Sequence, residues 1–157
     1  MAWLLSWLTG DTTLSGLPIA FLLGAMVGAE REWRQSAAGL RACVLVSVAA
    51  AAFADLMTTR VDPANLGAAF GAIATGVGFL GAGAIMREGA NVRGLSTAAT
   101  IWCVAAIGAQ AGAQETVGAL WLTVLVLLIN ILLKPVQRLI WRRRPPHPSA
   151  EDRALEG

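Results

Sequence analysis

Five apolar stretches follow one another through this chain, and each is close to the length that crosses a lipid bilayer. We place them at residues 14–29, 40–57, 66–86, 95–113 and 117–133, the last continuing as a basic helix to about residue 144. A hydrocarbon layer of about 30 Å requires roughly 20 helical residues. Backbone groups in lipid must pair internally, and the alternating strands of a barrel are missing from the sequence. The sequence therefore predicts an all-α membrane protein with about five transmembrane helices.

Composition supports the same class. The chain has 157 residues, of which 56% are hydrophobic and 14% charged, and its mean hydropathy is +0.62. A soluble domain carries about 25% charged residues. The surplus apolar surface has no soluble core large enough to cover it, which favours a lipid bilayer as the environment.

We divide the chain into three parts. Residues 1–13 are too short to span a bilayer and lack the features of a signal peptide, so we expect an interfacial segment anchored by Trp3 and Trp7. Residues 14–140 make up the transmembrane domain. Residues 141–157 form a basic, proline-rich tail that is too small to fold as a domain.

The sequence offers no motif for soluble-type catalysis. It contains no phosphate loop and no nucleophile elbow. Cys43 and Cys103 lie inside apolar runs without the spacing of a metal site or a disulfide framework. We therefore expect neither enzymatic activity nor a cofactor. The basic tail is explained more simply by contact with anionic lipid than by nucleic-acid binding.

The basic residues predict an orientation. Five crossings place eleven of the twelve basic residues on one side of the membrane and Arg60 alone on the other. By the positive-inside rule, the N-terminus is then outside and the tail cytoplasmic. The eleven are Arg31, Arg34, Arg41, Arg87, Arg93, Lys134, Arg138, Arg142, Arg143, Arg144 and Arg153.

Two charged turns carry most of the candidate functional polar residues. The first reads GAEREWRQSAAGLR and the second MREGANVRGL, and Gly89 is suited to end the helix before the second turn. The two turns either pair with each other through Arg and Glu or serve as solvated anchors. The candidates in and just after the turns are Glu30, Arg31, Glu32, Arg41, Arg87, Glu88, Asn91, Arg93, Thr97 and Thr100.

Asp55 is the internal acidic residue of the second apolar stretch. It lies 14 residues after Arg41, or roughly 21 Å along a helix, which is short of the far boundary of the hydrocarbon. An acid inside the membrane is a functional candidate by default. The alternative is that Asp55 sits at the outer interface and pairs with Arg60.

Small residues mark the expected helix-packing faces. In the third stretch Gly67, Gly71, Thr75, Gly78 and Ala82 share one helical stripe. Such residues let backbones approach closely in lipid. The stripe predicts that this helix is the central packing element of the bundle or that it lines a narrow path, and the alternative is packing alone. The candidate packing glycines are Gly24, Gly28, Gly71, Gly76, Gly78, Gly81 and Gly83.

These motifs resemble the MgtC/SapB family of bacterial inner-membrane proteins. The resemblance rests on GAERE at residues 28–32, GLR at 39–41, GVGFLGAGAIMREG at 76–89 and NVRGLSTAATIWCVAAIG at 91–108. It implies a multi-pass inner-membrane protein, and some members help bacteria to grow at low magnesium. Many relatives carry Arg and Gln where this chain has Ala68 and Gly71. Larger relatives add a soluble regulatory domain that this sequence does not include.

Three functions fit these observations. The favoured one is a non-enzymatic regulator of another membrane protein, linked to magnesium limitation or stress adaptation. The alternative is a transporter or channel for Mg²⁺ or another small solute. A third is structural dimerisation or lipid binding alone. Short glycine-rich helices leave packing faces to fill, so we also expect a homo-oligomer, with a dimer favoured.

Overall fold

The computed structural model describes residues 15–88 and 91–141, with no account of the side chains of Glu88, Lys134 and residues 136–141. The described chain divides into two compact units, with the boundary between Leu127 and Leu128. The expected interfacial segment at residues 1–13 lies outside the described residues, as does the tail beyond Trp141.

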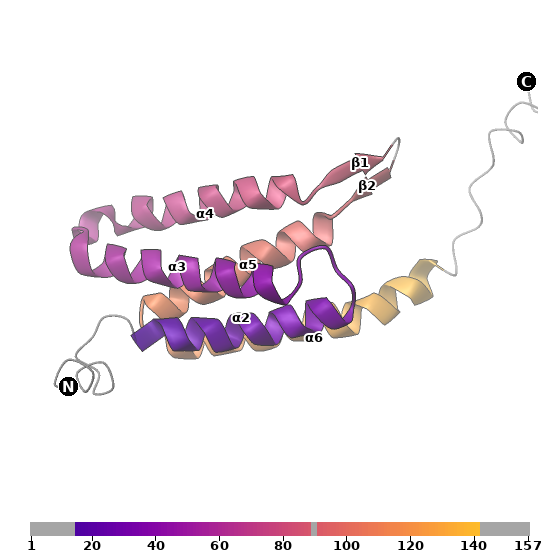
Figure 1. The fold of residues 1–157 in the computed structure, drawn as a ribbon, viewed down its shortest axis with the longest axis horizontal. Helices are drawn as coiled ribbons and strands as arrows, with labels where there is room; N and C mark the ends of the chain where they lie inside the picture. The colour runs from indigo at the N-terminus through magenta and orange to yellow at the C-terminus, as the bar shows by residue number, and fades with distance from the viewer. Residues whose placement is uncertain (1–14, 89–90, 142–157) are drawn as a thin grey trace, which may run out of the picture. The chain divides into compact units, whose positions relative to one another are not determined.

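Five long helices make up most of the described chain (Figure 1). The elements are α2 (Gly16–Trp33), α3 (Leu40–Arg60), the 3₁₀ turn η2 (Pro63–Asn65), α4 (Leu66–Gly83), β1 (Met86–Glu88), β2 (Asn91–Arg93), α5 (Leu95–Gly112) and α6 (Thr116–Trp141). Four stretches, in α3, α4 with η2, α5 and the first part of α6, are long and apolar enough to cross a membrane. The all-α membrane class is thereby confirmed. Helix α2 has 18 residues and differs because three consecutive charged residues lie near its C-terminus.

The region between α4 and α5 corrects one expectation. The third apolar stretch was expected to remain helical to Met86, but α4 ends at Gly83, and Gly89 lies outside the described residues. A short antiparallel hairpin follows, in which Met86 faces Arg93 and Glu88 faces Asn91. The physical reason is Gly94, whose φ of 89° suits glycine and whose missing Cβ leaves room for the Ala84 carbonyl oxygen.

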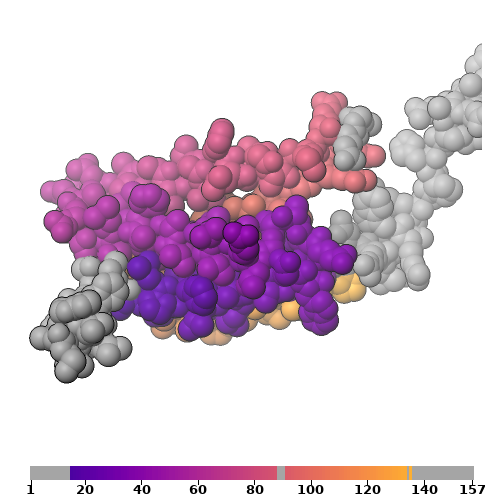
Figure 2. Space-filling view, viewed as in Figure 1, coloured from indigo at the N-terminus to yellow at the C-terminus, as the bar shows by residue number. Residues whose placement is uncertain are grey.

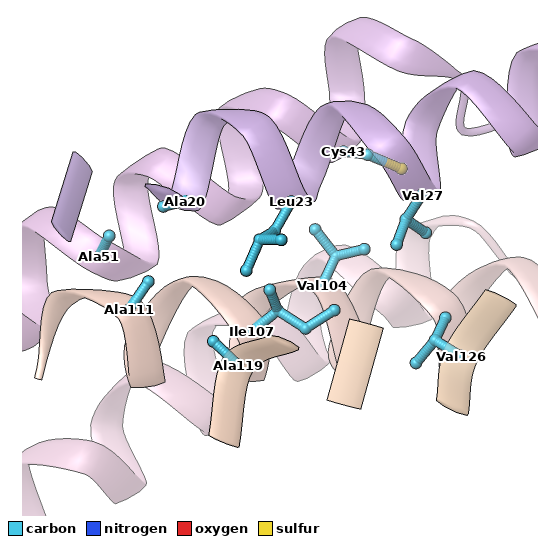
Figure 3. Close-up of a cluster of buried hydrophobic side chains, with 10 residues drawn as sticks. All are labelled: Ala20, Leu23, Val27, Cys43, Ala51, Val104, Ile107, Ala111, Ala119 and Val126. Carbon is cyan, nitrogen blue, oxygen red and sulfur yellow. The ribbon is translucent and has the colours of Figure 1, made fainter. Parts of the chain in front are cut away.

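Helices α3 and α5 form the centre of the larger unit, because each of them contacts the other and both α2 and α4. The α5 side chains Val104, Ile107 and Ala111 lie in one buried cluster (Figure 3). The cluster is completed by Ala20, Leu23, Val27, Cys43, Ala51, Ala119 and Val126. In this chain by itself, α4 does not have the central position that was one of the alternatives for the third stretch.

Two glycines of α5 explain how closely α5 approaches α3. A Cβ on Gly108 would overlap the backbone of Ser47, and one on Gly112 would overlap the backbone of Ala51. Similarly, Gly16 at the start of α2 lies against the backbone of Ala111. None of these three glycines was among the candidates, although Gly108 and Gly112 have the GxxxG spacing that allows close helix contact.

Helix α4 lies at the edge of the unit, packed against α5 and α3 along one side (Figure 1). The space-filling view shows atoms of α4 standing apart from those of α3, with α5 visible between them (Figure 2). An apolar groove of about 460 Å³ lies there, lined from α3 by residues such as Leu45 and Phe53 and from α4 by Ile73 and Leu80.

Candidate functional site

Most of the candidate polar residues gather at one end of the larger unit, which we call the hairpin end. It comprises the C-terminus of α2, the loop of residues 34–39, the N-termini of α3 and α5, and the β1–β2 hairpin (Figure 1). Arg60 lies at the opposite end, at the C-terminus of α3. The arginines at the hairpin end are Arg31, Arg34, Arg41, Arg87 and Arg93.

Glu30 sits in the last turns of α2 and is buried, with 9% of its surface exposed. Its Oε1 forms an ion pair with Nε of Arg34, one helical turn further on. Such a spacing brings the two side chains together on one face. Arg34 is partly exposed, so the pair reaches from the buried end of α2 toward the surface. Pairing with a cation offsets much of the cost of burying the Glu30 carboxylate.

Glu32 caps the N-terminus of α3. Its Oε2 accepts a hydrogen bond at 3.0 Å from the backbone N–H of Leu40, the first residue of α3. The first N–H groups of a helix have no partner within the helix. Gly39 precedes Leu40, and a Cβ on Gly39 would overlap the Glu32 carboxylate. The GAERE and GLR motifs are thus two parts of one helix cap.

Arg31 points from α2 toward α5. Its side chain is 7% exposed, and its Nη2 donates to Oγ1 of Thr97 at 3.2 Å. Thr97 lies in the first turn of α5, so this hydrogen bond joins elements 66 residues apart. Within the described chain, Nε of Arg31 has no hydrogen-bond partner.

Two glycines of α2, on the N-terminal side of these charged residues, let α2 and α3 pack closely. Gly28 lies against Leu40 and Cys43, and Gly24 lies against Ser47, whose hydroxyl donates to the Ala20 carbonyl at 2.8 Å. Added Cβ atoms would come within 2.8 Å of the Leu40 Cα and 2.7 Å of the Ser47 Cβ. The close contact positions the end of α2 so that Glu32 reaches the start of α3.

The remaining candidate polar residues at the hairpin end are mostly exposed, and Thr100 is buried. Arg41, Arg87, Asn91 and Arg93 are exposed. Glu88 pairs through its backbone with Asn91 in the hairpin. On α5, Thr100 is buried, and its hydroxyl donates to the Ser96 carbonyl at 2.8 Å. The structure therefore brings Arg31 and Thr97 together and places the other arginines at the same end of the unit.

Asp55 lies away from this group, five residues before the C-terminus of α3. It is 7% exposed, so its side chain is buried within the protein. Asp55 and Arg60 are both described, and no ion pair joins them. The pair with Arg60, which was the alternative for Asp55, is thus not formed. Across the residues that the structure describes, no three His, Cys, Asp or Glu side chains gather in a way that could hold a metal ion.

The candidate glycines of α4 differ in their surroundings. Gly81 lies against Ala98 of α5, at ordinary contact distances of 3.6 to 3.8 Å from the position of an added Cβ. The other four candidates have open space beside them. No described atom of another part of the chain lies within 4 Å of a Cβ added at Gly71, Gly76, Gly78 or Gly83.

Comparison with known proteins gives a consistent family assignment. A model of the MgtC family matches residues 17–139. Protein MgtC of Salmonella typhi is 48% identical over 136 residues, which are 87% of this chain and 58% of that protein. Protein MgtC of Salmonella typhimurium strain LT2 is 52% identical over 115 residues, or 73% and 49% of the two chains.

A third relative, Protein MgtC of Brucella abortus strain 2308, is 44% identical over 131 residues, covering 82% of this chain and 54% of the relative. The chain therefore spans about half the length of these curated relatives. No solved structure matches it.

Proposed function

This chain belongs to the MgtC family, and on that basis we propose that it is a non-enzymatic protein of the bacterial inner membrane that regulates another membrane protein. Under this proposal it works without a cofactor, during magnesium limitation or stress. The N-terminus is outside and the hairpin end is cytoplasmic, because the arginines of the larger unit gather at the hairpin end.

The observation that carries the proposal is the exposed face of α4. Gly67, Gly71 and Gly78 have no described atom of another element within 4 Å of an added Cβ. Their backbone is therefore open to the surroundings along three turns of the helix. In lipid, helices associate through close backbone approach at small residues. Such a face suits contact with another transmembrane helix.

Two apolar grooves beside α4 indicate the chemistry of its surroundings. The groove toward α3 holds about 460 Å³ and is lined entirely by apolar residues. The groove toward α5 holds about 400 Å³ and is lined mainly by Phe70, Trp102 and alanines. Both grooves are lined from α4 by Ile73 and Val77, on a side of the helix that faces away from the glycine face, so they show that the surroundings of α4 are apolar on that side as well. We therefore assign the face to a transmembrane helix of another protein.

The test places a photo-crosslinking amino acid at position 78 in living cells. Position 78 has open space, so the substitution leaves the fold intact. We expect a crosslink to a defined membrane protein, enriched under magnesium limitation. The same amino acid at Ala52, exposed on α3 and outside the lining of both grooves, is the control. Crosslinks at position 78 to lipid alone would argue against a protein partner, and crosslinks to a second copy would assign the face to the dimer.

A transport function remains the second candidate because Asp55 is buried in a helix that can span the membrane. A buried carboxylate there is costly and is typical of ion and proton pathways. We would measure Mg²⁺ flux into liposomes that contain only the purified protein. Loss of flux in Asp55→Asn, with normal flux in Asp62→Asn, would favour transport. Asp62 is the matched control because it is exposed, and an Asn there can keep its bond to the Ala64 N–H.

A further inference from the structure

Arg31 is a buried cation that lacks an anionic partner in the described structure. Its side chain is 7% exposed, and Thr97 supplies its hydrogen bond through an uncharged hydroxyl. Its Nε is buried and has no partner among the described residues. The neighbouring carboxylate of Glu30 is engaged with Arg34. A buried guanidinium normally requires an anion, because removing its charge from water is unfavourable.

The N-terminus of α5 provides a second attraction for an anion at the same place. Helix α5 has 18 residues, and its N-cap, Gly94, makes no side-chain cap. The first N–H groups of a helix lack partners within it, and the aligned peptide dipoles make this end positive. Arg31 reaches this turn through Thr97, three residues after the N-cap. The Arg31 guanidinium and the positive N-terminal end of α5 would therefore attract an anion at the same place.

The first turn of α5 is exposed on its outer side. Leu95 and Ser96 in the first turn of α5 are exposed, whereas Thr97 on the inner side is buried. Arg93, two residues before the helix, is also exposed. The first turn of α5 therefore has one side at the surface and an inner side that contacts Arg31 through Thr97.

We propose that Arg31 and the first turn of α5 bind a phosphate-type oxyanion, either the headgroup phosphate of a lipid or free inorganic phosphate. A guanidinium presents several N–H donors in a fixed plane that match phosphate oxygens. Helix N-termini supply further N–H donors to the same ligand. The bound anion neutralises Arg31 and fixes the end of α2 against the start of α5. This site is separate from the face of α4.

The experiment measures thermal unfolding of the purified full chain in a neutral detergent. One arm adds inorganic phosphate, and the other adds a soluble short-chain phosphatidylglycerol, both against chloride at equal ionic strength. We expect one ligand to raise the unfolding temperature in a saturable way. Arg31→Met should weaken that apparent affinity by at least about tenfold, since hydrogen bonds to a charged group are lost. The exposed Arg41→Met is the matched control and should keep the response.

A second variant decides the outcome if Arg31→Met fails to fold. Ser96 is exposed in the first turn of α5, where an acidic residue favours the helix. Ser96→Asp should stabilise the ligand-free protein and abolish the ligand response, whereas Ser96→Asn should retain it. A response to phosphatidylglycerol alone assigns the site to a lipid headgroup, and a response to inorganic phosphate assigns it to the free anion. No response to either ligand, or equal responses in all variants, overturns the proposal.

Discussion

Single residues of the GAERE motif have distinct physical tasks. Glu30 pairs with Arg34, Arg31 reaches α5, and Glu32 caps α3. Consecutive residues of a helix point about 100° apart, which is why three charged neighbours can serve three different partners. The motif therefore connects three helices from the end of one of them, and its charges are more than surface anchors.

The cap between Glu32 and Gly39 yields the first prediction. Glu32→Ala removes the acceptor of the Leu40 N–H, and Gly39→Ala displaces the same carboxylate with its Cβ. Each substitution should lower the free energy of unfolding by about 1 kcal/mol, the usual loss when a helix cap is removed. The double variant should lose little more than either single variant, because both remove one interaction.

Unfolding of the purified protein by a denaturing detergent would measure the three variants. Arg41→Ala, one residue after Leu40 and exposed, serves as the control for changes at the start of α3. Fully additive losses would mean that Gly39 and Glu32 act independently, contrary to the capping arrangement.

At the scale of whole elements, glycine has opposite roles in α5 and α4. On α5, Gly108 and Gly112 touch the backbone of α3, so no side chain fits. On α4, Gly71 and Gly78 face open space. The first set holds this chain together, whereas the second leaves a surface that another helix can cover. From sequence alone, glycines of the second set were named as packing candidates and the first set was left out, because spacing does not say which face of a helix meets its neighbour.

This difference gives the second prediction. Gly112→Ala should destabilise the protein by about 1–3 kcal/mol, the usual cost of overpacking, because its Cβ overlaps the backbone of Ala51. Gly76→Ala should be neutral or stabilising by up to about 1 kcal/mol, since alanine favours the helix and has room. The denaturing-detergent titration measures both variants. Equal destabilisation by the two variants would contradict the assignment of α5 to the packed centre and of α4 to the open edge.

For the molecule as a whole, length and hydropathy were enough to predict the helices. The membrane class and the four apolar spans follow from them, because lipid leaves the backbone few options. The hairpin was missed because its two strands have three residues each and lie in a charged turn, which is too short for an alternating pattern to indicate strands. The contacts of Arg31 and Glu32 were also beyond prediction, since they depend on how α2, α3 and α5 meet in space.

The orientation of the molecule is the third prediction. The arginines at the hairpin end favour retention of that end in the cytoplasm, so the η2 turn should face outward. Single cysteines at Val92 and Asp62, both exposed, report the two ends once Cys43 and Cys103 are replaced by alanine. In intact spheroplasts, a membrane-impermeant maleimide should label Asp62→Cys at once and Val92→Cys only after permeabilisation.

The same labelling also tests whether charge sets this orientation. Replacing Arg87 and Arg93 by glutamine removes two of the arginines at the hairpin end but leaves Arg31, Arg34 and Arg41. Because orientation follows the difference in positive charge between the two sides, three arginines against Arg60 should still hold the hairpin end inside. Immediate labelling of Val92→Cys in the unaltered background would reverse the assignment. It would also place the oxyanion site of Arg31 on the outer side, where a cytoplasmic phosphate could not reach it.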